Sequence, residues 1–323
     1  MKFGIFLLVF ALFSAKAYAG LPNDTIYKKK VDTTKHWTYK GNYAIMLNQI
    51  SFNNWAAGGE SSLSGRASVD YQLQYKKGRF SFDHSAHLAY GLVGYMHKRV
   101  QKTDDKLDLL FSLSNQFSKK WYFSGVVSFK TQFSKGYQNP DFIHEISNFM
   151  APGYLTVSLG FRFQPRKNFN LFMSPFAGKI TFVLDQSLAN QGAFGVKKAV
   201  CDSAGNIIVP GQNMTGEVGI NILSSYQANV MKNMLFKTRI SLYNNYLEEE
   251  PSKRWQWDMD WHNELTFKVN KFISTALIVQ LKYDPNVVFP IYKNINGQNI
   301  IISERDRLQW KEVLGIGFMY SVQ

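Results

Sequence analysis

Residues 63–75 read LSGRASVDYQLQY, and residues 255–269 read WQWDMDWHNELTFKV. In both segments apolar or small residues alternate with polar ones, as Trp261 does between Asp260 and His262. Successive side chains of a β-strand point to opposite faces, so each segment would form a strand with one apolar and one polar face. These two stretches therefore predict an all-β protein.

The same alternation recurs from residue 42 to the C-terminus and predicts twelve strands. Their expected ranges are 42–54, 61–76, 79–95, 106–117, 121–134, 154–164, 168–184, 215–229, 234–246, 255–268, 272–284 and 307–321. Short basic turns alternate with longer links along most of the chain. An even number of strands with short turns on one side and long loops on the other indicates an antiparallel up-and-down barrel of the outer-membrane type.

Three features favour a membrane barrel over a soluble periplasmic β-sandwich that binds a ligand, which also has alternating strands. The strands are about twice as long as the average soluble strand. Aromatic residues fall where strands meet turns, as at Tyr75 and Phe80 or at Phe117 and Trp121. The third feature is an export signal at the N-terminus, described next.

The first nineteen residues, MKFGIFLLVFALFSAKAYA, combine a basic start, an apolar stretch and a small-residue cleavage pattern. This pattern is typical of a cleaved signal peptide. We predict a signal peptide at 1–19, a periplasmic segment at 20–41 and the barrel at 42–323, located in the cell outer membrane. No other long apolar run is present in the sequence, which excludes a protein with several membrane-spanning helices.

The chain is basic, with a formal net charge of +14, and has one cysteine, Cys201, which excludes an intramolecular disulfide. Lysine and arginine cluster at the turns and near the expected mature N-terminus, where they can meet anionic lipid headgroups. We expect outer-membrane lipid and lipopolysaccharide as partners. No nucleic-acid recognition motif accompanies the basic residues, so nucleic acid is not expected.

The last strand carries Gly315, Phe318 and Tyr320, a spacing that resembles the signal read by the barrel-assembly machinery. This machinery is therefore an expected partner during biogenesis. Glu312 of the same strand falls on the predicted lipid face, where a charge is costly near the bilayer centre.

Local irregularities are expected at a few positions. The apolar face changes phase near residues 46–52, which predicts a bulge, and Pro175 must avoid a position that donates to the ladder. Asn296-Gly297 and Gly205 predict hairpins within two long loops, which would project from the cell surface.

The segment LNQISFNNWAAGGESSLSG at 47–65 resembles the uncharacterised exported bacterial family catalogued as domain of unknown function 3078. The matching residues are Gln49, Phe52, Asn54, Trp55, Ala56, Gly58 and Gly59. The resemblance implies an exported Gram-negative barrel and brings no assigned activity. In the first outward link, Trp55, Gly58 and Gly59 would form a mouth or lid, or alternatively a tight connection with an interfacial tryptophan.

The predicted inward faces carry equal numbers of opposite charges. The seven acids are Asp70, Asp83, Asp108, Glu217, Asp258, Asp260 and Glu264. The seven bases are Arg66, Lys130, Arg162, Lys237, Arg239, Lys282 and Lys311. A twelve-stranded barrel has a narrow bore that such side chains can largely fill by pairing across it. As possible contacts of a small solute we single out Arg66, Asp70, Arg162, Arg239, Asp258 and Glu264.

The sequence offers only weak candidates for catalytic residues. Asp260 and His262 lie on one wall, about 7 Å apart along the strand, a spacing that could orient a general base of an outer-membrane hydrolase. No facing acid pair is forced to the same height, so we favour a protein that is not an enzyme. The six scattered histidines form no metal motif, and no cofactor is expected. Two functions stay open: a narrow solute passage, or an envelope or surface component with an unidentified protein partner.

Overall fold

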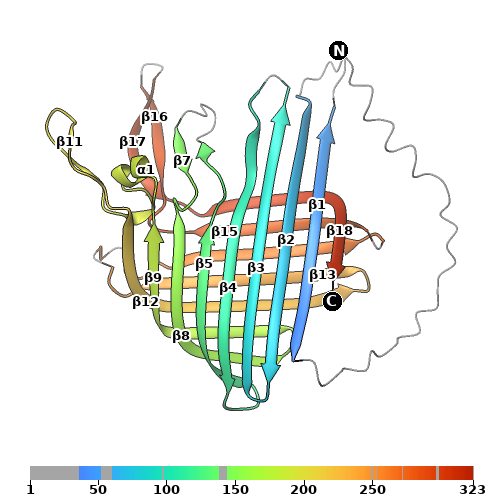
Figure 1. The fold of residues 1–323 in the computed structure, drawn as a ribbon. Helices are drawn as coiled ribbons and strands as arrows, with labels where there is room; N and C mark the ends of the chain where they lie inside the picture. The colour runs from blue at the N-terminus through green and yellow to red at the C-terminus, as the bar shows by residue number, and fades with distance from the viewer. Residues whose placement is uncertain are drawn as a thin grey trace. The chain divides into compact units, whose positions relative to one another are not determined.

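A computed structural model describes residues 36–51, 60–96, 98–137, 144–248, 250–251, 253–270, 272–295 and 298–322. Twelve long antiparallel strands close into a barrel with the neighbour order β1-β18-β15-β14-β13-β12-β9-β8-β5-β4-β3-β2 (Figure 1). Their bounds are β1 Trp37–Ile50, β2 Ser62–Lys77, β3 Phe80–Tyr95, β4 Gln101–Gln116, β5 Trp121–Thr131, β8 Gly153–Arg166, β9 Phe169–Phe182, β12 Met214–Met231, β13 Met234–Asn245, β14 Asp258–Lys268, β15 Ile273–Tyr283 and β18 Gln309–Val322. The predicted number and order of strands are confirmed.

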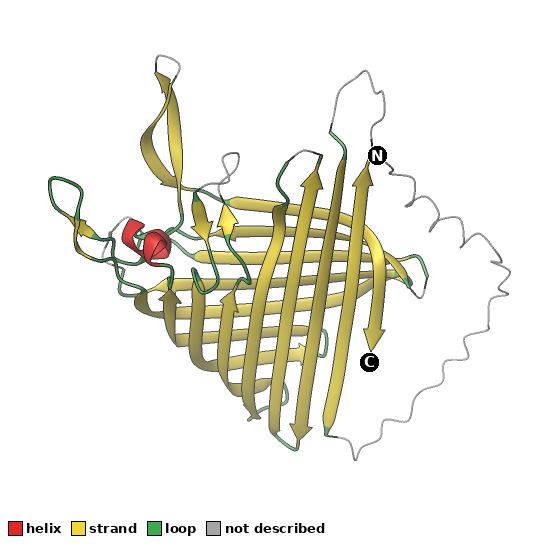
Figure 2. Cartoon of the chain, turned by 45° about the horizontal axis from the view of Figure 1, so that its top comes forward, coloured by secondary structure: helices red, strands yellow, loops and turns green. Residues whose placement is uncertain are grey.

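Each strand pairs with its chain neighbours, and the barrel closes between β1 and β18. Short turns join strands at one end, which we call the turn end, and the long connections lie at the opposite end, the loop end (Figure 2). Two strands start five residues earlier than predicted, β1 at Trp37 and β4 at Gln101. Among the described residues, no helix is long and apolar enough to span a membrane.

The large apolar side chains lie on the outside of the barrel. Ile45 and Leu47 of β1 and Phe318 of β18 each expose more than half of their surface. Polar side chains point inward, and several of them are buried, among them Arg66 of β2, Arg162 of β8 and Glu264 of β14. A soluble sandwich does the reverse, since it packs its apolar faces together and turns polar faces to water. The structure is therefore a membrane barrel with an outward apolar face and a polar interior.

Aromatic residues pack together near the turn end, where the sequence predicts them. Tyr75 and Phe80 flank the β2–β3 turn with their ring centroids 6.3 Å apart. Trp121 of β5 packs on Phe163 of β8 with centroids 4.7 Å apart. Such rings suit the interface between hydrocarbon and headgroups.

The expected irregularities have different outcomes. Pro175 lies in a bulge, because the ladder of β9 shifts against β8 and against β12 at this point. The bulge predicted near residues 46–52 is wrong within the described residues, since β1 pairs with β2 without a shift up to Ile50. Ile50 lies on the last rung of that ladder, where the strand leaves the barrel wall. An apolar side chain there requires no change of phase.

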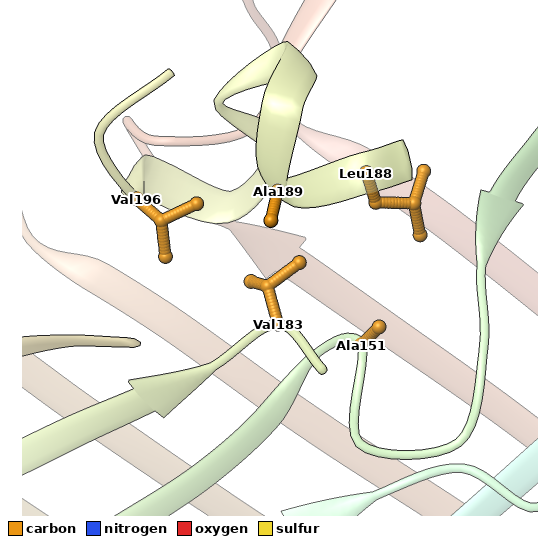
Figure 3. Close-up of a cluster of buried hydrophobic side chains, with 5 residues drawn as sticks. All are labelled: Ala151, Val183, Leu188, Ala189 and Val196. Carbon is orange, nitrogen blue, oxygen red and sulfur yellow. The ribbon is translucent and has the colours of Figure 1, made fainter. Parts of the chain in front are cut away.

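The loop end carries an ordered cap. Helix α1 (Gln186–Gln191) and the 3-10 helix η3 (Ala193–Gly195) follow β9, and Asp185 caps α1 by accepting hydrogen bonds from the backbone amides of Ser187 and Leu188. A small apolar cluster joins this segment to the ends of β8 and β9 (Figure 3). Its buried members are Ala151, Val183, Leu188, Ala189 and Val196.

Hairpins also extend from the loop end (Figure 1). The pair β10 (Val200–Cys201) and β11 (Ile207–Val209) contains Gly205 with φ +86°, and β16 (Val288–Ile295) pairs with β17 (Gln298–Asp306). Both lie where the sequence predicts hairpins. A third small pair, β6 (Gly136–Tyr137) with β7 (Glu145–Ser147), was not predicted.

Candidate functional site: a charged lumen

The interior of the barrel is the candidate site, because the predicted solute contacts all lie on inward faces. Arg66, Arg162 and Glu264 are buried, and Asp70, Asp258 and Arg239 retain more exposure. All six take part in ion pairs. The contacts group into clusters near the loop end, at mid-height and near the turn end.

The cluster near the loop end centres on Lys179 of β9. Its Nζ lies 2.5 Å from an Asp258 carboxylate oxygen and 3.1 Å from one of Glu217. The ammonium also lies 4.9 Å from the ring centroid of Tyr243 and 5.6 Å from that of Tyr154. Five strands thus contribute to one ammonium site, which combines two ion pairs with cation–π contacts.

At mid-height, ion pairs cross the bore. Lys130 of β5 lies 3.2 Å from Asp260 of β14, five positions away around the barrel. Arg239 of β13 reaches Asp70 of β2 at 3.5 Å, again five positions away. Asp70 also pairs with the Nδ1 atom of His87 at 2.5 Å. These contacts connect opposite walls.

Three further ion pairs, on two carboxylates, lie inside the bore. Asp104 of β4 receives Arg66 Nε at 2.7 Å and Lys311 Nζ at 2.5 Å. Glu264 accepts from Lys237 at 3.3 Å and from the Thr266 hydroxyl at 2.9 Å.

Near the turn end, Arg162 of β8 pairs with Asp83 of β3, and their charged atoms lie 2.7 Å apart. Arg162 also donates to the Ser81 hydroxyl at 3.1 Å and lies over the Tyr122 ring at 4.6 Å from its centroid. Gln74 donates to Asp83 at 2.6 Å.

Side chains therefore occupy much of the bore. A lumen cavity lined by Arg66, Asp70, His87 and Glu264, among others, has a volume of about 20 Å³. That volume corresponds to about one water molecule. This cavity has no room for a larger solute.

The weak catalytic candidates do not form a dyad. Asp260 pairs with Lys130 and accepts from Gln280 at 2.6 Å, and neither of its contacts is His262. His262 is buried, and its two ring nitrogens have no hydrogen-bond partner among the described residues. Its ring instead packs edge-on against His87, with centroids 5.7 Å apart. Within the described residues there is also no group of side chains arranged to bind a metal ion.

Three inward charged residues were not predicted from the sequence. Asp104 precedes the predicted start of its strand, and a bulge opposite Gly91 and Leu92 sets its direction. Lys106 lies at the edge of the same predicted strand and pairs with Asp108 at 3.1 Å. Lys179 follows the Pro175 bulge, which reverses the alternation of β9. For Lys179 the sequence did contain a signal, because Pro175 interrupts an otherwise regular strand.

The predicted mouth or lid, Trp55, Gly58 and Gly59, lies outside the described residues, as does the predicted signal peptide.

Comparisons with known proteins agree with the resemblance found in the sequence. The model of the family DUF3078, a protein of unknown function, matches residues 47–137. The sequence has no significant match among curated proteins.

Similar solved structures include the COG4313 outer membrane channel from Pseudomonas putida F1, at 9% identity and a TM-score of 0.37, over 95% of this chain and 98% of that one. The NanC porin is similar at 9% identity and a TM-score of 0.35, over 86% of this chain and 98% of that one. The translocator domain of the autotransporter NalP from Neisseria meningitidis is similar at 7% identity and a TM-score of 0.34, over 89% and 88% of the two chains.

Proposed function

We propose that this protein is an integral outer-membrane barrel that provides a narrow passage for small hydrophilic solutes and is closed at rest by ion pairs across its lumen. Export would use the signal peptide at 1–19, and the barrel-assembly machinery, lipid and lipopolysaccharide would be its partners in the envelope. The observation that carries the proposal is the balanced set of charges inside the bore.

Stability alone does not account for these charges. Replacing a buried ion pair by well-packed apolar residues is often neutral or stabilising, because the pair must be removed from water. The predicted inward faces nevertheless carry seven acids and seven bases, and Asp104, Lys106 and Lys179 add to the ion pairs of the lumen. A lumen that only filled space has no need of this composition. A lumen that water and ions enter favours it, because the charges keep their hydration.

The closing contacts can open by side-chain movement alone. Lys130 and Arg239, which cross the bore, keep 34% and 43% of their side-chain surface exposed. Both are long, flexible side chains with hydrophilic ends. Rotation of these two groups would break contacts between opposite walls without any change of the strands.

Conductance in planar bilayers tests the proposal. Wild-type protein should give small and rare currents, and the double variant Lys130→Ser/Arg239→Ser should conduct more. Because Asp260 and Asp70 would lose cationic partners, that variant should also select for cations. Glu60→Gln is the matched control, since Glu60 pairs with Lys98 at the exposed loop end. A double variant that runs as a folded, heat-modifiable barrel but stays silent would refute the passage.

A second function, as a surface component of the envelope, is favoured by the ordered cap of α1 and η3 on its apolar cluster. It predicts a barrel that stays sealed in all lumen variants. The same conductance experiment therefore separates the two functions.

A further inference from the structure

A groove runs across the outer wall of the barrel where the first and last strands meet. It has a volume of about 540 Å³ and crosses β18, β1, β2 and β3. Its outward-facing lining includes Tyr43, Ile45, Ala67, Tyr90, Phe318 and Tyr320. A hollow of this size lies within the range of small-molecule sites, about 300–1,000 Å³.

The hollow arises from one small residue in a row of large ones. In the ladders Ile45 pairs with Ala67 and Ala67 pairs with Tyr90, so the methyl group of Ala67 lies between two large side chains. On the inner face of the same wall, Asp70 of β2 pairs with Arg239 across the bore.

The lining has almost no polar surface to offer a ligand. The Tyr43 hydroxyl is 2.5 Å from that of Tyr39, and the Tyr90 hydroxyl is 3.2 Å from that of Ser134. The polar ends of these tyrosines are therefore already paired, and their rings face the groove. A hydrocarbon chain fits such a surface, whereas a polar or charged ligand would lose its hydration without compensation.

Aromatic and basic residues on one side of the groove indicate which leaflet supplies the chain. Trp37 and Tyr75, with ring centroids 4.8 Å apart, lie on the turn-end side of the groove and mark the interface there. Beyond them the β2–β3 turn exposes Lys76, Lys77 and Arg79. From Val69 to Lys76 the strand rises roughly 23 Å, which is comparable to the length of an extended acyl chain. A chain in the groove would thus place an anionic headgroup near these bases.

We propose that this groove is a specific site for one acyl chain of a phospholipid from the periplasmic leaflet, held across the closing seam. The proposal rests on the membrane location in the proposed function but not on conduction. The seam gives the site a structural role. β1 and β18 pair only from Gly41 with Val322 to Leu47 with Ile316. Beyond Leu47 the two strands have no rung among the described residues, and Asn48 reaches the Leu314 carbonyl at 3.5 Å.

Native mass spectrometry of the full chain, extracted from outer membranes in mild detergent, tests the site. Wild-type protein should retain one phospholipid per barrel. Ala67→Trp fills the groove and should reduce the retained fraction at least about tenfold. Ala86→Trp is the matched control, because Ala86 is an outward residue of β3 that does not line the groove. It should retain the lipid as wild type does.

Three outcomes would overturn the proposal. They are wild-type protein that retains no lipid, equal lipid retention by Ala67→Trp and Ala86→Trp, and a bound species with the mass of lipid A. A dimer that only Ala67→Trp dissociates would show that a second copy covers the groove. Heat-modifiable gel mobility of both variants distinguishes loss of the lipid from loss of the barrel. If neither tryptophan variant folds, Ala67→Leu and Ala86→Leu replace them.

Discussion

The Arg162–Asp83 pair at the turn end allows the energetics of the lumen to be measured directly. The two side chains are 7% and 15% exposed, and their charged atoms lie 2.7 Å apart. We consider Asp83→Asn, which keeps the shape of the side chain and removes its charge. Arg162 would then lie buried without a carboxylate partner, beside the Ser81 hydroxyl and the Tyr122 ring.

The expected cost follows from burial. Removing one partner of a buried ion pair typically costs about 3–5 kcal/mol, because the other charge stays desolvated and uncompensated. The asparagine can still accept a hydrogen bond, so we expect the low end, about 3 kcal/mol. The Lys98–Glu60 pair has the same 2.7 Å separation but is 54% and 50% exposed. Glu60→Gln should therefore cost at most about 1 kcal/mol.

Urea unfolding in detergent micelles, followed by the mobility of unboiled protein on a gel, measures both variants. The free energy of unfolding should fall much more for Asp83→Asn than for Glu60→Gln. The double variant Asp83→Asn/Arg162→Gln should recover part of the loss, since it removes the stranded charge. A loss below about 1 kcal/mol for Asp83→Asn would refute the view that this pair is desolvated.

Three further predictions concern the seam, the lipid face and the cap. A Cβ atom at Gly317 would lie 2.0 Å from the Ile45 carbonyl oxygen, so Gly317→Ala should separate β18 from β1 and lower the heat-modifiable fraction on gels. Gly178→Ala is the control, because a Cβ atom there would have no other atom within 4 Å, and it should leave that fraction unchanged. Glu312 is exposed on the lipid face without a hydrogen-bond or ion-pair partner among the described residues. Glu312→Leu should therefore raise the midpoint of urea unfolding. A lower midpoint would contradict the placement of Glu312 on the lipid face. A hydrogen bond from the Asn148 side chain, with those from the backbone amides of Leu188 and Ser187, holds the pKa of Asp185 below its usual value. Its stabilising effect on α1 is thus complete above the unfolded pKa of about 3.9 and is lost as pH falls through the lower folded pKa. At neutral pH, Asp185→Ala should cost about 1 kcal/mol of local stability, measured by hydrogen exchange at residues 186–191, and unchanged exchange would contradict the cap.

Much of the barrel follows from local sequence. The alternation in residues 63–75 and 255–269 sets which side chains face outward, because each residue of a barrel wall must face either lipid or lumen. Turn composition and strand length then predict the number of strands. For the same reason the fourteen predicted inward charges could be read from their positions along single strands.

Contacts between strands could not be read in this way. Lys130 and Asp260 are 130 residues apart, and only the closure and stagger of the whole barrel bring them together across the bore. Lys179 was missed because one extra residue at the Pro175 bulge reverses every later side chain of β9. The sequence by itself thus determined the strands and their two faces, since a period of two is a property of neighbouring residues. The tertiary structure alone decided which charges pair and where Ala67 leaves a groove, because both depend on the register between distant strands.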